Sequence, residues 1–239
     1  IIIGNEILSG RTQEINVQAI SNWLNSLGVK LEEVRVIPDV QKTIITTINE
    51  IRKQFKYIFT TGGIGPTHDD ITSESISKAF NVSYCYHPGA YKILENYYGK
   101  EHFNIGRRKM AKMPKNSSLI LNPSSAAPGF NIKNVYSLPG VPSILKSMLG
   151  GLNNKIIGGK KILSETLSLR TVESDISIPL EKVQNKFKKL EIGSYPFFKK
   201  GKVGVSLVIR SNNKKLIEKC KIDIIKFVKK KKIKIITKK

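Results

Sequence analysis

Short apolar strands alternate with amphipathic helices through the first 150 residues, and this alternation constrains the fold more than any other feature. The expected strands are Ile1–Ile3, Val29–Ile37, Tyr57–Thr61 and Val135–Leu138. The expected helices are Glu14–Leu27, Pro38–Phe55, Thr72–Phe80 and Pro142–Met148. Strands joined through helices make right-handed crossovers and therefore lie parallel. The sequence thus predicts an α/β domain over residues 1–150, with a mostly parallel sheet and flanking helices.

The second half has a different order of elements, strand–helix–strand–strand–helix–strand. The expected elements are Ile162–Leu169, Ser174–Phe187, Ile192–Phe198, Val203–Ile209, Lys214–Val228 and Ile233–Ile236. Within the first helix, Ile178, Val183 and Phe187 are the expected inward side chains. This order is typical of a ferredoxin-like fold. We therefore predict a small α+β subdomain over residues 151–239, after a glycine-rich linker that starts near Gly150.

Charge is unevenly distributed between the halves. The chain has 41 basic and 18 acidic residues, a net charge of +23. Residues 151–239 hold 24 of the basic and 7 of the acidic residues. The joint excess of Lys and Ile is typical of compositional bias, and the alternative is attraction of anions such as nucleotides. Few arginines and no interleaving of aromatic with basic residues argue against specific nucleic-acid recognition.

The segment Thr61–Thr72 carries the strongest chemical signal. It follows a buried strand and precedes a helix, so its backbone amides form a cradle for an anion such as phosphate. Adjacent carboxylates beside a phosphate favour a divalent cation between them. A plain strand-to-helix turn with a helix cap is the alternative. The candidate phosphate or nucleotide ligands are Thr61, Gly62, Gly63, Gly65 and Thr67, and the candidate catalytic acids are Asp69 and Asp70.

Three further segments are expected at the same edge, because ligands of open α/β sheets bind where the parallel strands end. Asp39 follows the second strand and is either a metal ligand and catalytic acid, together with Asp70, or a helix cap. The loop Asn122–Phe130 consists of small residues that can wrap a ligand. The other candidate ligand-binding residues are Gly4, Asn5 and Glu6 after the first strand, and Pro139, Gly140 and Ser143 after the last.

Several classes of protein are excluded. No apolar run reaches the roughly 18 residues of a membrane helix, so we expect no membrane association. Cys85 and Cys220 form no paired motif, which favours a cytoplasmic, reducing setting. Zinc-protease, acyl-transfer and P-loop motifs are absent. No signal peptide is visible, and because the apolar run at Ile1 is typical of a strand that starts upstream, we expect at least one residue before it.

These segments together resemble the molybdopterin-binding (MoaB/MogA-like) superfamily. The resemblance is greatest to the N-terminal domain of the competence/damage-inducible protein CinA and to the molybdopterin-binding-like domain of FAD synthases. It is carried by Gly4–Gly10, Pro38-Asp39, Thr61–Thr72, Asn122–Gly129 and Leu138–Pro142, and also by Ile192–Pro196. The resemblance implies that Asp39 and Asp70 are the paired ligand- and metal-site aspartates. It also implies that Gly62, Gly63 and Gly65 form the phosphate loop.

The resemblance implies a stand-alone member that hydrolyses a nucleotide diphosphate such as ADP-ribose or FAD with Mg²⁺, Mn²⁺ or Co²⁺. Three positions depart from the family pattern: Ile144 replaces a Glu, Ser125 lies where Gly-Thr is common, and Met110 replaces a Gln. The alternatives are molybdopterin adenylyl transfer and a non-catalytic module that binds a pterin or nucleotide. The oligomeric state, including a homo-oligomer, stays open.

Overall fold

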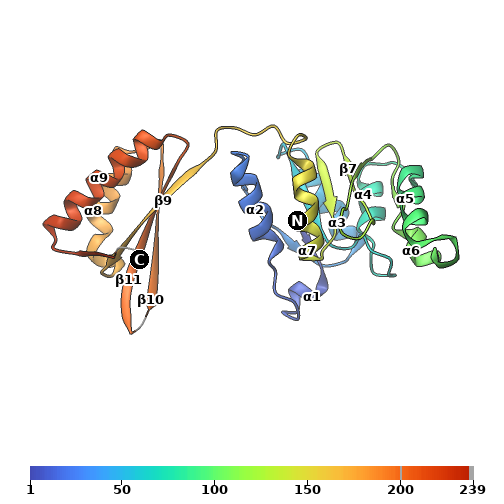
Figure 1. Cartoon of the computed structure of the whole chain (residues 1–239), viewed down its shortest axis with the longest axis horizontal. Helices are drawn as coiled ribbons and strands as arrows, with labels where there is room; N and C mark the ends of the chain where they lie inside the picture. The colour runs from blue at the N-terminus through green and yellow to red at the C-terminus, as the bar shows by residue number, and fades with distance from the viewer. Residues whose placement is uncertain (200, 237–239) are drawn as a thin grey trace. The chain divides into compact units, whose positions relative to one another are not determined.

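The computed structural model describes residues 1–199 and 201–236 and divides the chain into two units (Figure 1). Unit 1 consists of residues 1–24 and 30–157, and unit 2 of residues 25–29 and the chain from Gly158 onward. The division therefore falls later than residue 150. Residues Gly150–Leu152 form a 3-10 turn (η2), and the side chains of Leu152 and Ile156 are buried.

The centre of unit 1 is a six-stranded mixed sheet. Its strands are β1 (Ile2–Ile3), β2 (Val36–Ile37), β3 (Ile58–Thr61), β6 (Ser118–Ile120), β7 (Gly129–Ile132) and β8 (Val135–Leu138). The spatial order is β2-β1-β3-β8-β7-β6. The first four strands of that order run parallel, β7 pairs antiparallel with β8, and β6 pairs antiparallel with β7. A separate antiparallel pair joins β4 (Tyr84–Tyr86) to β5 (Lys112–Pro114). The predicted, mostly parallel α/β fold is confirmed.

Helices flank this sheet and complete the core of unit 1 (Figure 1). They are α1 (Asn5–Leu8), α2 (Asn16–Ser26), α3 (Gln41–Ile51), α4 (Thr72–Ala79), α5 (Pro88–Tyr98), η1 (Lys100–His102), α6 (Ile105–Lys109) and α7 (Pro142–Leu149). In α3, Ile44, Ile48 and Ile51 recur at helical spacing, and all three are buried. Burial of such a stripe stabilises a helix more than its intrinsic propensity does.

Two boundaries in unit 1 differ from the prediction. The strand expected over Val29–Ile37 shortens to β2, because β1 offers only two residues for pairing. The helix expected from Pro38 begins at Gln41, since Val40 has an extended backbone with φ −122°. The intervening residues Pro38 and Asp39 are thereby left in a loop at the end of β2.

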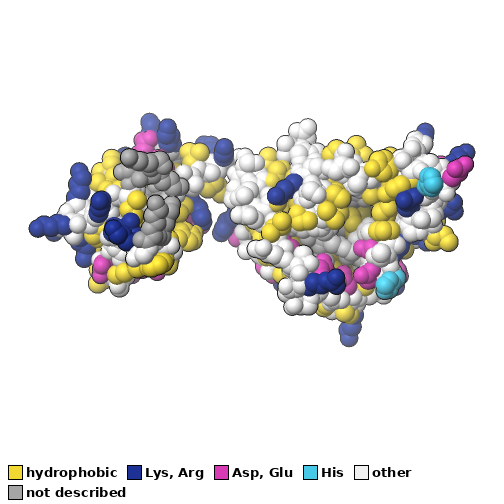
Figure 2. Space-filling view, turned by 60° about the horizontal axis from the view of Figure 1, so that its bottom comes forward, with side chains coloured by type: hydrophobic (Ala, Val, Ile, Leu, Met, Phe, Trp, Pro, Cys, Tyr) yellow, Lys and Arg dark blue, Asp and Glu magenta, His cyan; other side chains and the backbone are white. Residues whose placement is uncertain are grey.

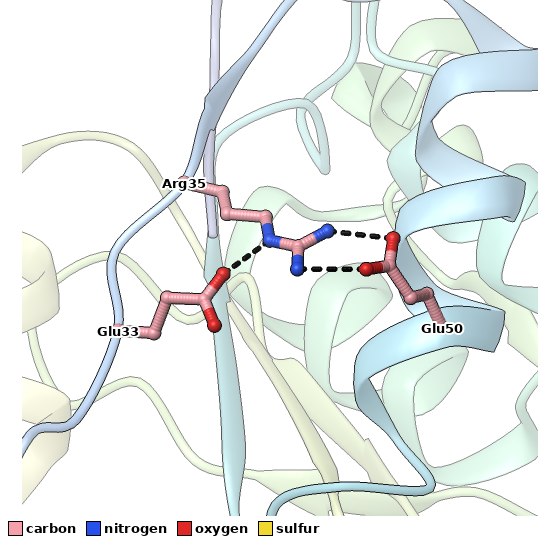
Figure 3. Close-up of polar contacts among 3 residues, drawn as sticks. All are labelled: Glu33, Arg35 and Glu50. Atoms are coloured by element: carbon pink, nitrogen blue, oxygen red, sulfur yellow. Dashed lines mark hydrogen bonds and ion pairs between the residues drawn. The ribbon is translucent and has the colours of Figure 1, made fainter.

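An ion-pair cluster attaches the segment before β2 to α3 (Figure 3). The guanidinium of Arg35 donates two hydrogen bonds to the Glu50 carboxylate, at 2.7 and 2.9 Å, and its Nε donates to Glu33. These bonds lower the pKa of Glu50 below its ordinary value. This bidentate pair fixes the segment before β2, which has no strand pairing of its own, against α3.

Unit 2 has the predicted ferredoxin-like arrangement. Its elements are β9 (Leu163–Arg170), α8 (Glu173–Lys186), β10 (Glu191–Lys199), β11 (Lys202–Ser211), α9 (Lys214–Lys230) and β12 (Lys234–Ile236). The sheet is antiparallel in the order β10-β11-β9-β12, and α8 and α9 pack against it around a buried core. The turn expected at Lys199–Lys202 includes Lys200, which lies outside the described residues, as do residues 237–239.

The prediction is wrong for one core residue of unit 2. Ile178 has 66% of its surface exposed, whereas Ile176 is fully buried. Ile176, Val183 and Phe187 lie seven and four residues apart, so they share one helical face. Ile178 lies two residues from Ile176 and therefore points away from that face.

Candidate functional site

Loops from three parallel strands of unit 1 meet around a cavity of about 700 Å³. They follow β1, β3 and β8 at the carboxyl edge of the sheet, where open α/β sheets bind ligands. The loop before β7 and residues of α5 and α6 complete the wall. On the face shown in Figure 2, acidic side chains lie beside hydrophobic ones on unit 1. Of the predicted site residues, the lining includes Glu6, Gly62, Gly63, Gly65, Asp70, Pro139 and Gly140.

The Gly loop, residues 62–65, forms one wall of the cavity. Gly62 and Gly63 have φ values of +98° and +67°, a backbone conformation that favours glycine. A Cβ at Gly62 would lie 2.1 Å from the carbonyl oxygen of Ile3, and one at Gly63 would lie 2.2 Å from the hydroxyl of Thr72. Both glycines are therefore required by the close packing of the loop against β1 and α4.

Three consecutive amides of this loop have no acceptor in the part of the chain that the structure describes. Within the described residues, the backbone N–H groups of Gly63, Ile64 and Gly65 donate no hydrogen bond. Gly62, by contrast, donates to the carbonyl oxygen of Leu138 at 3.2 Å. The residues with unused amides all line the cavity. Adjacent unused amides in a glycine-rich loop make a concave site for an anion.

Asp70 places a carboxylate on the cavity wall next to these amides. Its Oδ2 accepts hydrogen bonds from the backbone N–H and the hydroxyl of Thr67, at 2.8 and 2.6 Å. Its Oδ1 accepts no hydrogen bond from the described residues. Asp69 and Thr67 are exposed and do not line the cavity. Asp70 thus has one oxygen fixed by the loop and a second available to a ligand.

Asp39 does not cap the helix that follows it, because the N-cap of α3 is Val40, but it does contact the start of α1. Its Oδ2 accepts a hydrogen bond from the backbone N–H of Asn5 at 2.8 Å, at the start of α1. It does not line the cavity, and neither do Gly4, Asn5 and Ser143. Thr61 lines a smaller neighbouring cavity of about 50 Å³ that also touches Glu6. The structure therefore brings Glu6, and not Asp39, into the same cavity wall as Asp70.

Two cavity residues that the sequence analysis missed are Arg107 and Tyr98. The guanidinium carbon of Arg107 lies 4.2 Å from the centre of the Tyr98 ring, and Arg107 also donates to the carbonyl oxygen of His102. These contacts hold a cation at the wall of the cavity. The signal in the sequence was the basic run Arg107–Lys109, which follows the helix cap Asn104.

All three departures from the family pattern line this cavity. Met110, Ser125 and Ile144 belong to three different segments, yet each contributes to the wall. Val141 and Ala127 extend the apolar surface beside them. The cavity wall therefore combines unused backbone amides and the Arg107 guanidinium with apolar side chains, a mixture that is common in ligand pockets.

The residues suit a cation that arrives with a phosphate better than a preformed metal site. Among the described residues, no group of three or more His, Cys, Asp and Glu side chains can hold a metal ion. Asp70 and Glu6 nevertheless supply two carboxylates to one cavity. Mg²⁺ is usually bound by one or two carboxylates together with substrate phosphates and water. Asp70 and Glu6 are therefore the residues that would hold a divalent cation bound jointly with a nucleotide.

Sequence comparison gives matches to both units. Residues 1–157 match the family model described as "Probable molybdopterin binding domain", and residues 161–236 match "FAD synthase, middle domain". A CinA-like protein of Prochlorococcus marinus (strain MED4) is 31% identical over 248 residues. That match covers 95% of this chain but only 57% of the relative, so the chain spans little more than half of the relative's length. A protein of Archaeoglobus fulgidus is 31% identical over 196 residues, covering 82% of this chain and 84% of that one.

Comparison with solved structures agrees with the sequence matches to CinA-like proteins. The crystal structure of "the protein CinA with unknown function" from Thermoplasma acidophilum matches with a TM-score of 0.61 and 31% identity. The match covers 64% of this chain and 94% of that one. No helix in the described part of the chain is both long and apolar enough to cross a bilayer.

Proposed function

Because this chain belongs to the molybdopterin-binding domain family and is CinA-like, we propose that its cavity binds a nucleotide diphosphate and hydrolyses the phosphoanhydride bond. ADP-ribose and FAD are the leading substrates. The observation that carries the proposal is the run of unused amides at Gly63, Ile64 and Gly65 beside the free oxygen of Asp70. Amides aimed at developing phosphate charge are the usual means of stabilising such a reaction.

In this proposal some cavity residues bind the substrate and others take part in the reaction. The loop amides would bind one phosphate, and the Arg107 guanidinium would bind further negative charge from its own part of the cavity wall. Asp70 and Glu6 would hold a divalent cation, which when bound neutralises the diphosphate and activates water. The apolar side, with Met110 and Ile144, would contact the ring system. The cleavage balances as addition of one water across the P–O–P bond, giving two phosphate monoesters.

A non-catalytic binding module is the second candidate, and a specific observation favours it. Ile144 lies in the cavity wall at the position where the family pattern has a Glu. An aliphatic side chain there cannot hold a metal or move a proton. Molybdopterin adenylyl transfer would use the same loop and acids, so only the choice of substrate distinguishes it from hydrolysis.

One experiment distinguishes the three functions. The purified chain is incubated with ADP-ribose, FAD or ATP plus molybdopterin, each with Mg²⁺, Mn²⁺ or Co²⁺, and products are identified by chromatography. Calorimetry on the same nucleotides measures binding. Release of AMP from ADP-ribose or FAD supports hydrolysis. Binding without products supports the non-catalytic module, and an adenylylated pterin supports the transferase. Failure to bind any of these ligands refutes all three.

A further inference from the structure

The sheet of unit 2 has one face that neither of its helices covers. The helices α8 and α9 pack on the face that carries Leu167, Leu207 and Ile209. Side chains alternate along a strand, so the intervening residues belong to the opposite face. We call this the open face. It consists of Ser164, Thr166, Ser168 and Arg170 of β9, Glu191, Gly193, Tyr195 and Phe197 of β10, Lys202, Gly204, Ser206, Val208 and Arg210 of β11, and Lys234 and Ile236 of β12.

Two aromatic rings of the open face lie over glycines, which leave room for them. An added Cβ at Gly204 would lie 2.4 Å from the ring of Phe197, and one at Gly193 would lie 2.6 Å from the ring of Tyr195. Tyr195 keeps 45% of its surface exposed. Between the strands, the hydroxyls of Ser168 and Ser206 lie 3.2 Å apart and share a hydrogen bond. The open face therefore presents aromatic rings next to small polar groups.

Four cations lie on the same face as these rings, and one acid, Glu191, is the direct cross-strand neighbour of Arg210. Arg210 lies with its guanidinium carbon 5.9 Å from the centre of the Tyr195 ring. Arg170 and Lys234 are direct cross-strand neighbours, an arrangement in which like charges repel. Among the described residues, neither these three side chains nor Lys202 forms an ion pair. An anion bound across the face would relieve this repulsion.

We propose that the open face binds single-stranded nucleic acid with little preference for base sequence. Exposed aromatic rings stack on any base, and a ring of cations follows the phosphates. Three spacings between four strands give a width of about 14 Å, enough for two or three stacked bases. The linear sequence concealed this surface, because its aromatic and basic residues come from different strands and meet only through the register of the sheet.

The probes are fluorescent 15-residue strands of oligo(dT) and oligo(U), and a 15-base-pair duplex, titrated with the full chain at several salt concentrations. We expect both single strands to bind more tightly than the duplex. With up to four phosphates neutralised, the slope of log K against log salt should be about −3 for single strands. Replacing Tyr195 by Ala should weaken binding about 10-fold, since one stacked base is lost. Comparing the two strands shows whether DNA or RNA is preferred.

Matched variants separate the open face from the general positive charge. Phe198 lies on the same strand as Phe197 but points to the other side, and it is 73% exposed. Phe198→Ala should therefore leave affinity within about 2-fold, whereas Phe197→Ala should weaken it about 10-fold. Replacing Arg170 and Lys234 by Gln should reduce the salt slope by about 1.4, and replacing Lys219 and Lys229 of α9 should change it less.

Three results would overturn the proposal. One is equal affinity for duplex and single strands with no effect of Tyr195→Ala, which indicates diffuse charge alone. Another is loss of affinity in the α9 variant equal to that in the Arg170/Lys234 variant. The third is a dimer in sedimentation that Tyr195→Ala dissociates and oligonucleotide does not, which makes the face a self-interface. Tyr195→Phe tests for misfolding, because it keeps the stacking ring and should bind like the wild type.

Discussion

Replacing Asp70 by Asn is the most direct test of the proposed chemistry. The amide oxygen of Asn can still accept both hydrogen bonds from Thr67. To do so, it must place its NH₂ group where Asp70 has its free oxygen. The position of the free Asp70 oxygen, which can accept a hydrogen bond or coordinate a cation, would then hold a hydrogen-bond donor. We therefore expect turnover of ADP-ribose or FAD to fall by at least about 100-fold, the usual effect of removing one electrostatic group.

The effect on stability should be small by comparison. A hydrogen bond to a charged acceptor contributes about 1 kcal/mol more than one to a neutral acceptor. Asp70 accepts two such bonds but is partly exposed, so water weakens the difference. We expect the free energy of unfolding to fall by about 1 kcal/mol, which lowers Tm by about 2–4 °C for a chain of this size. Calorimetric unfolding measures this loss independently of activity.

Thr67→Val is the matched control for Asp70→Asn. It removes the hydroxyl donor but keeps the backbone donor and the Asp70 charge. Turnover should fall less than 10-fold, with an unchanged dependence on Mg²⁺ or Mn²⁺. In the Asp70→Asn protein, nucleotide binding without metal should persist, because loss of a carboxylate reduces repulsion of phosphate. A folded Asp70→Asn protein with wild-type turnover and metal dependence would show that Asp70 serves the loop alone.

Three further predictions concern the fold. Gly63→Ala should lower the free energy of unfolding by about 1–3 kcal/mol in urea titrations, because its φ is +67° and its Cβ would contact α4, whereas Gly140→Ala should cost less, since its Cβ comes no nearer than 3.3 Å to another residue. Hydrogen bonds from Arg35 lower the pKa of Glu50 in the folded state, so its stabilising contribution is present above its unfolded pKa and is lost as the pH falls through the folded pKa. The Tm difference between wild type and Glu50→Gln should therefore narrow as the pH is lowered and disappear once Glu50 is protonated in both states. Cys220 is fully buried and burial raises its pKa to about 11, so a thiol reagent at pH 8 should modify half-buried Cys85 first and reach Cys220 only when unit 2 opens; equal rates would contradict the packing of α9.

The Gly loop is an example of a structure that the local sequence predicts. Its position between a buried strand and a helix predicted a turn with free amides, and the backbone of residues 62–65 has that form. The two element orders likewise predicted the two sheets, because side-chain periodicity reports which face of an element is buried. The strand before Pro38 was predicted too long, since its length depends on how many residues β1 offers for pairing.

The composition of the cavity and the open face was decided by tertiary structure. Asp39 and Asp70 looked equivalent in sequence, but Asp39 contacts the start of α1 while Glu6 joins Asp70 at the cavity. Arg107 enters the wall from a helix that follows the Gly loop by some forty residues. Periodicity determines which way a side chain points within its own element. Which side chains then meet depends on strand order, register and the paths of crossovers, and these are set by packing of the whole chain.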